Sequence, residues 1–161
     1  MSTPTIRPIT VSDNVRVAEI IRKVMTEFSC VGTGFSIEDP EVDDMFNAYA
    51  DERAAFYAIE HQGQVMGCGG FAALEGGDAD TCELKKMYFL EGLRGLGMGA
   101  ALVDLCIKEA RDKGFKKMYL ETVERMTAAN HLYRKKGFSL LEGAKGATGH
   151  SGCDSFYELL L

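Results

Sequence analysis

The sequence has no apolar run approaching the roughly 20 residues that a membrane-spanning helix needs. Its opening stretch, MSTPTIRPIT, also lacks the basic and then apolar pattern of a secretory signal. These two absences predict a cytoplasmic protein that does not bind membranes.

The sequence also contains no CxxC pair. Its five cysteines are odd in number and scattered along the chain: Cys30, Cys68, Cys82, Cys106 and Cys153. A disulfide framework or a structural zinc site would require paired, regularly spaced cysteines. We therefore expect free thiols and no bound metal.

An excess of basic charge is missing as well. The 18 lysines and arginines are outnumbered by 24 aspartates and glutamates, which gives a net charge of -6. Nucleic-acid binding needs a basic face to neutralise phosphates, so this balance argues against it and favours a cationic partner. The 161 residues contain no repeat, linker or low-complexity tract, and they predict a single domain spanning residues 1–161.

Local patterns predict the order of helices and strands. Residues 5–10 alternate like a short strand, and Ser12 can cap a helix whose apolar residues recur at intervals of three and four up to Phe28. An irregular acidic stretch follows, with a short helix after Pro40. Beyond it, the expected elements are a hairpin over 54–74, a strand over 81–90, a helix over 98–113, a strand over 116–122, a helix over 126–136, and strands over 138–142 and 155–161. The predicted fold is α+β, with one mixed sheet.

The segment EGLRGLGMGAAL, residues 91–102, places four glycines within eight residues directly before a predicted helix. Backbone amides converge at a helix N-terminus, and the helix dipole adds partial positive charge there, so such a loop favours an anion. Arg94 adds a guanidinium suited to phosphate. A ligand that contains phosphate is therefore expected at this loop.

One interpretation of this loop is a dinucleotide-binding module. Gly95, Gly97 and Ala100 satisfy GxGxxA, and Glu121 follows Gly99 by 121 − 99 = 22 residues, near the roughly 20 expected of a ribose-binding acid. Against this, the preceding strand is charged rather than continuously apolar, and too few strands remain for a second mononucleotide-binding half.

A second interpretation rests on two linked motifs. Arg94-x-x-Gly97-x-Gly99 resembles the RxxGxG pyrophosphate loop of the GNAT family of acyl-CoA-dependent N-acyltransferases, and AANHLYRKKGF, residues 128–138, resembles that family's asparagine and tyrosine helix. The tail GHSGCD, residues 149–154, is similar to a bacterial branch with a GHxxCD loop. The resemblance extends over roughly residues 6–160, although Glu91 and Leu96 replace the proline and the basic residue that the family often has.

The resemblance implies a central, mostly antiparallel sheet of six to seven strands, about four helices, and a parallel strand pair that splays apart. It also implies an acetyl-CoA site. The implied coenzyme-binding residues are Met87, Tyr88, Phe89, Arg94, Gly95, Leu96, Gly97, Met98, Gly99, Asn130 and Tyr133.

The same resemblance assigns chemical roles. An amine must lose its proton before it attacks a thioester, and Glu83 is the candidate base, acting directly or through a water. Tyr133 would give a proton to the departing thiolate. Phe28, Phe35 and His150 are assigned to the substrate side, and the acidic residues of SIEDPEVDD, 36–44, are expected to attract cations near the acceptor entrance.

The function that these residues imply is acetyl transfer from acetyl-CoA to a primary amine of a small-molecule or amino-acid-like substrate, in a ternary complex. The resemblance is compatible with a homodimer. Two alternatives stay open: a non-catalytic acyl-CoA sensor, in which Glu83 and Tyr133 are vestigial, and the dinucleotide-binding module.

Overall fold

Seven strands form one mixed sheet in the computed structural model, which describes residues 2–161. The strands are β1 (Thr5–Pro8), β2 (Ala55–His61), β3 (Gln64–Ala73), β4 (Thr81–Phe89), β5 (Lys117–Thr122), β6 (Ser139–Leu141) and β7 (Ser155–Leu160). They lie in the order β1-β2-β3-β4-β5-β7-β6. The pair β4 and β5 is parallel, and the other neighbouring pairs are antiparallel. The predicted fold class is confirmed.

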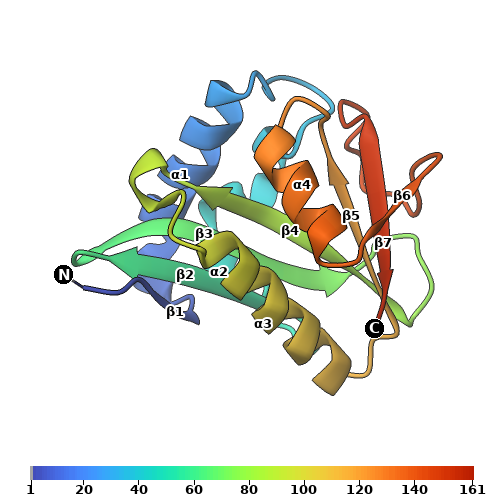
Figure 1. Cartoon of the computed structure of the whole chain (residues 1–161), viewed down its shortest axis with the longest axis horizontal. Helices are drawn as coiled ribbons and strands as arrows, with labels where there is room; N and C mark the ends of the chain where they lie inside the picture. Colours follow the sequence, from blue (N-terminus) through green and yellow to red (C-terminus); the bar gives the residue numbers. More distant parts are fainter. Residues whose placement is uncertain (1) are drawn as a thin grey trace.

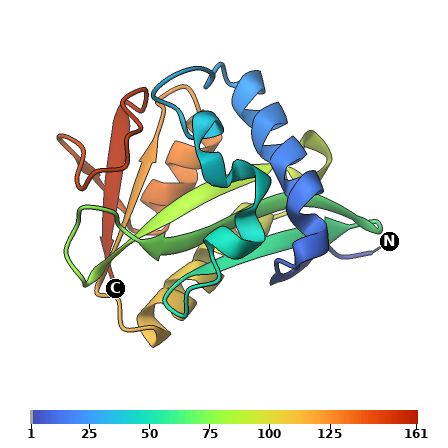
Figure 2. The ribbon, with the colours of Figure 1, turned by 180° about the vertical axis from the view of Figure 1, so that it is seen from behind.

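Helices cover both faces of this sheet. The α-helices are α1 (Asn14–Glu27), α2 (Met45–Ala48), α3 (Met98–Asp112) and α4 (Thr127–Lys135), and short 3-10 turns include η2 (Ser36–Glu38), η3 (Pro40–Asp43) and η4 (Glu91–Leu93). Figure 1 shows α3 and α4 on one face, and Figure 2 shows α1 and α2 on the other. Each face has its own buried apolar cluster, one beneath α3 and α4 and one beneath α1 and α2.

Local sequence explains most element boundaries. The β2–β3 hairpin turns on Gln62 and Gly63, both with positive φ, as a two-residue turn requires. Gly114, with φ +89°, follows the end of α3 and lets the chain leave the helix in a left-handed conformation.

The start of α1 differs from the expectation. Ser12 does not cap the helix, because a 3-10 turn over Val11–Asp13 precedes it. Asp13 instead accepts hydrogen bonds from Thr10 and pairs with Arg7 of β1 at 2.7 Å. Attachment to the first strand therefore decides where this helix begins.

Within residues 2–161, the helices are all too short or too polar to cross a membrane.

Candidate active site

The parallel strands β4 and β5 separate in the middle of the sheet. They pair from Thr81 with Lys117 to Glu83 with Tyr119, and β4 then continues to Phe89 without pairing with β5. Figure 1 shows the two strands diverging from the end near the C-terminus. The predicted splayed pair is therefore present, and Glu83 lies where the separation begins.

β4 also has a bulge, which lies where this strand pairs with β3 on the side away from β5. Gly70 of β3 pairs with Lys85 and Cys68 pairs with Tyr88, so Lys86 and Met87 lie opposite a single residue of β3. Lys86 has φ +53°, a conformation that costs free energy for any residue other than glycine. Its side chain is 1% exposed, and its ammonium donates to Asp39 at 2.8 Å. This buried ion pair joins the bulge to the acidic segment.

A cavity of about 620 Å³ opens beside the end of β4. Eight of the predicted coenzyme-binding residues line it: Met87, Tyr88, Phe89, Arg94, Gly95, Gly97, Met98 and Gly99. Leu96 lies outside this lining and is 48% exposed. We call this space the donor cavity.

The donor cavity reaches the N-terminus of α3. Gly97 precedes the helix in a left-handed conformation, with φ +77°, and no side chain caps the helix there. A methyl group at Gly97 would meet no atom within 4 Å. The uncapped start of α3 therefore borders the donor cavity, which is the arrangement of an anion site at a helix N-terminus.

Two arginines connect this cavity to the end of α1. Arg94 donates to the Phe89 carbonyl at 3.0 Å and holds both oxygens of Glu27 at 2.6 and 3.0 Å. Arg125, from the turn after β5, donates to the carbonyls of Phe28 and Ser29. Arg94 lowers the pKa of the Glu27 carboxyl. Phe28, predicted on the substrate side, lines the donor cavity.

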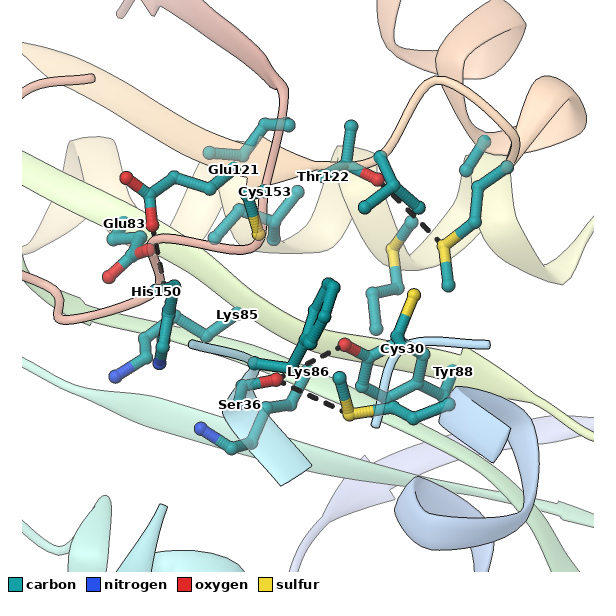
Figure 3. A pocket seen from close by; sticks show the side chains of 18 of the residues that line it. Cys30, Ser36, Glu83, Lys85, Lys86, Tyr88, Glu121, Thr122, His150 and Cys153 are labelled. Carbon is teal, nitrogen blue, oxygen red and sulfur yellow. Dashed lines mark hydrogen bonds and ion pairs between the residues drawn. The ribbon is translucent and has the colours of Figure 1, made fainter. Parts of the chain in front are cut away.

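A smaller cavity of about 60 Å³ lies between β4 and β5. It shares Met87, Tyr88, Met126 and Ala129 with the donor cavity, so the two spaces adjoin. Glu83, Tyr133, Phe35 and His150 also line it, together with Glu121 and Cys153. We call it the acceptor cavity, and Figure 3 shows it from close by.

Glu83, the predicted base, is a buried carboxylate of the acceptor cavity. It is 4% exposed. Burial raises the pKa of Glu83 to about 7, and the nearby Glu121 adds to this effect while Lys85 and His150 oppose it. Lys85 and Lys86 pair with Glu41, and Lys86 also with Asp39, so they are not the partners that a surface role for Glu83 would require. Glu83 has no hydrogen-bond partner among the residues drawn in Figure 3.

His150 lies between two carboxylates. Its Nε2 is 2.9 Å from Asp39, and its Nδ1 is 3.5 Å from Glu121. These contacts raise the pKa of His150 to about 9. Glu121 also accepts hydrogen bonds from Tyr119 and Thr148, each at 2.6 Å, and its own pKa is lowered.

Tyr133 and Asn130 come from α4. Tyr133 is 6% exposed, packs against Phe138 and Tyr157, and has a pKa that burial raises well above its usual value. Asn130 donates to the carbonyls of Val123 and Met126 and accepts from the Tyr157 hydroxyl at 2.7 Å. The asparagine therefore fixes the turn between β5 and α4.

Thiol chemistry does not fit this site. All five cysteines are free, but burial raises the pKa of Cys153 to about 12, so its thiol stays protonated at neutral pH. One group of candidate metal ligands lies in the described part of the chain, where ligand atoms of Glu83, Glu121 and His150 are within 4.8 Å of one another. Both nitrogens of His150 already face carboxylates, so a metal ion would have to displace one of these ion pairs.

Several members of this site were not predicted from the sequence. Glu121 appeared there only as the ribose-binding acid of a dinucleotide module, and Asp39 only as part of an exposed acidic entrance. The structure pairs Asp39 with Lys86 and His150, Glu41 with Lys85 and Lys86, and Asp43 with Arg22. The acidic segment is thus largely neutralised by its own contacts. The sequence shows that this segment is rich in acids, but it does not show their ion-pair partners, which lie far away along the chain.

The fold is that of acetyltransferases with solved structures. A GNAT-family acetyltransferase from Staphylococcus aureus Mu50 superposes with a TM-score of 0.83 at 21% identity, covering 97% of this chain and 98% of that one. YncA of Salmonella typhimurium, solved with its cofactor acetyl-CoA, superposes with a TM-score of 0.77 at 22% identity, covering 99% and 94%.

The amino-acid sequence shows the family. The acetyltransferase (GNAT) family matches residues 18–138. YjgM, an uncharacterised N-acetyltransferase of Escherichia coli K12, is 38% identical over 152 residues, which are 94% of this chain and 91% of that protein. The chain therefore belongs to the acetyltransferase (GNAT) family. The predicted enzyme class is confirmed, and family membership removes the dinucleotide-binding alternative.

Proposed function

We propose that this protein transfers an acetyl group from acetyl-CoA to a primary amine of a small-molecule or amino-acid-like acceptor, by direct attack in a ternary complex. The observation that supports this most strongly is the junction of the donor and acceptor cavities at the separation of β4 from β5. A thioester entering from one cavity and an amine entering from the other would meet near Met87 and Tyr88, on the strand that carries Glu83 into the acceptor cavity.

The donor cavity suits coenzyme A in size and in chemistry. In our proposal the pantetheine arm follows Met87, Tyr88 and Phe89, and the pyrophosphate lies against the amides at residues 95–99 and Arg94. The open space at Gly97 and the uncapped N-terminus of α3 support this assignment. The acetyl-CoA bound to YncA supports the choice of acyl donor.

Glu83 and Tyr133 would manage the protons of the reaction. Glu83 takes a proton from the acceptor ammonium, directly or through a water, which frees the nitrogen lone pair. A C–N bond then forms as the C–S bond of the thioester breaks, and Tyr133 gives its hydroxyl proton to the departing sulfur. The second proton that the nitrogen must lose to become an amide passes through solvent and restores the Tyr133 hydroxyl, and Glu83 releases its proton to solvent. A carboxylate with a pKa of about 7 is well matched to base catalysis near neutral pH.

We further propose one domain over residues 1–161, a cytoplasmic location, and a reaction that needs no metal. The continuous seven-stranded sheet supports the single domain, and the five free thiols suit a reducing compartment. A homodimer is also part of the proposal, and size-exclusion chromatography with light scattering tests it by measuring the molar mass in solution.

The primary experiment is a panel of small amines and amino acids, assayed for free CoA in the presence of acetyl-CoA and EDTA. We expect thiol release that depends on the acceptor, and initial-rate plots that intersect, as a ternary complex requires. Thermal stabilisation by acetyl-CoA but not by NAD is expected before any acceptor is known. Stabilisation without turnover across the whole panel would favour the acyl-CoA sensor instead.

A further inference from the structure

The loop between β6 and β7, residues 142–154, is fastened above the acceptor cavity by several contacts. Thr148 donates to Glu121, and the Lys145 amide donates to the Tyr119 hydroxyl at 3.0 Å. Near its end, the Gly152 amide donates to the Gly34 carbonyl at 2.8 Å. The loop therefore touches both β5 and the segment that follows α1.

His150 differs from these anchors because its contacts are ionic on both sides. Its Nε2 lies 3.0 and 2.9 Å from the two oxygens of Asp39, and its Nδ1 faces Glu121. Nε2 is within hydrogen-bond distance of Asp39, and Nδ1 lies 3.5 Å from Glu121 as an ion pair, so a carboxylate on each side of the ring favours the doubly protonated, cationic imidazole. The side chain is 8% exposed, so this charge is screened only weakly by solvent.

The cation lies beside the proposed base. Atoms of His150, Glu121 and Glu83 fall within 4.8 Å of one another, and Figure 3 shows the three side chains on the same side of the cavity. The negative charge of Glu121 disfavours ionisation of Glu83, and the positive imidazolium partly offsets this effect.

We propose that His150 is a positioning residue of the acceptor site: as a fixed imidazolium between Asp39 and Glu121, it pins the 142–154 loop over the cavity and adds positive charge that favours the ionised form of Glu83. This inference rests on the proposed role of Glu83 as the base. It assigns His150 a function through Glu83 rather than a direct contact with the acceptor.

Other charged and titratable groups around Glu83 come from several elements. They are Lys85 and Lys86 on β4, Tyr119 and Glu121 on β5, Asp39 and Glu41 in the acidic segment, Tyr49 after α2, and Cys153 in the loop. Lys85 and Lys86 are shared with Glu41 and Asp39, whereas His150 opposes Glu121 directly. Removing the His150 charge therefore leaves only Lys85 and Lys86, which are themselves paired with Glu41 and Asp39, to oppose the effect of Glu121 on Glu83.

The test compares His150→Gln with Thr148→Val. Glutamine keeps hydrogen-bonding groups but has no charge, whereas Thr148→Val loosens the same loop and leaves every charge in place. The acidic limb of kcat/KM against pH, measured from pH 5.5 to 8.5, should move up by about one unit in His150→Gln, which lowers kcat/KM about fivefold at pH 7. Thr148→Val should leave the limb where it is. A uniform loss across pH in both variants would reduce His150 to a structural anchor and overturn the proposal.

A second measurement does not depend on turnover. Nitrogen-15 chemical shifts report the protonation of each imidazole, and the chain has three histidines, so His150→Gln identifies its signal. We expect His150 to be doubly protonated at pH 8, and a neutral ring at pH 7 would overturn the proposal. If no amine in the panel is acetylated, the proposed function fails. The protonation state of His150 is still measured in that case, so the two failures can be told apart.

Discussion

Glu83 and Tyr119 form the last pair of the parallel strands, and beyond them β4 and β5 diverge. The base proposed for the reaction is therefore held by a sheet at the position where that sheet opens. Backbone pairing on one side fixes the carboxylate, and the cavity on the other side leaves it accessible to an acceptor.

Replacing Glu83 by Gln should remove the acidic limb of the pH profile. In the native enzyme we expect kcat/KM to rise through an apparent pKa of about 7, because Glu83 acts as a base only when ionised. Glu83→Gln should lower kcat by about 10² to 10⁴-fold and flatten this limb. Glu38→Gln, at an exposed acid of the neighbouring segment, is the matched control and should keep the native profile. A limb that persists in Glu83→Gln would assign it to another group.

The same substitution should stabilise the fold above neutral pH. The folded pKa of about 7 exceeds the ordinary 4.5, so the folded protein binds this proton more tightly than the unfolded chain does. Stability therefore falls as pH rises from 4.5 towards 7, and glutamine, which has no charge to bury, avoids that loss. Urea unfolding should show Glu83→Gln to be more stable by up to about 3 kcal/mol at pH 8, with little difference at pH 4. Equal differences at both pH values would contradict the raised pKa.

Tyr133→Phe tests the proposed acid. The ring packing should survive, so folding and acetyl-CoA affinity should change little. We expect kcat to fall by roughly 10 to 10²-fold, since a thiol with a reference pKa near 8.5 leaves fairly well without assistance. Donors with more acidic thiols should show a smaller loss. Tyr57→Phe, at a buried tyrosine of β2, serves as the control. Full kcat in Tyr133→Phe, where chemistry limits the rate, would make the tyrosine structural.

The two ends of α3 offer a matched pair of glycine substitutions. Gly97 and Gly114 both have positive φ, and a methyl group on either would meet no atom within 4 Å. The backbone strain of Gly97→Ala and Gly114→Ala should thus be similar, about 1 to 2 kcal/mol. Calorimetry should show weakened acetyl-CoA binding for Gly97→Ala alone, because its methyl group projects towards the proposed phosphate. Equal affinities in the two variants would place the phosphate elsewhere.

Glu27→Gln should strengthen acetyl-CoA binding. Glu27 accepts hydrogen bonds from both terminal nitrogens of the Arg94 guanidinium, and a phosphate must compete with it for those donors. Both side chains are partly exposed, at 44% and 33%, so the gain should be modest, up to about fivefold in Kd. Glu19→Gln, on the same helix and paired with Arg16, should leave Kd unchanged. An unaltered Kd in Glu27→Gln would mean that Arg94 keeps Glu27 when the coenzyme binds.

Most of the fold could be predicted because its signals are local. The hairpin at Gln62–Gly63, the glycine that ends α3 and the glycines that precede it each encode a backbone conformation within a few residues. The donor cavity follows from the same kind of signal, since its lining comes largely from one continuous segment, 87–100.

The acceptor cavity could not be predicted in the same way. His150 and Asp39 are 111 residues apart, and Lys86 and Asp39 are 47 apart, and no local pattern encodes such pairs. The bulge at Lys86 is equally hidden, because its unusual φ accompanies contacts with Asp39 and Glu41. Ser12 failed as a helix cap for a related reason, since Asp13 is engaged by Arg7 of another element.

The ion pairs around the acceptor cavity have a consequence for its total charge. Three cations are matched by three carboxylates: Lys85, Lys86 and His150 by Asp39, Glu41 and Glu121. Their sum is zero, so an ionised Glu83 leaves the group with one negative charge. An arriving ammonium cancels that charge, and transfer of its proton to Glu83 leaves a neutral amine beside a neutral cluster. The reaction could then begin without recruiting or expelling a counter-ion, in a space of only about 60 Å³.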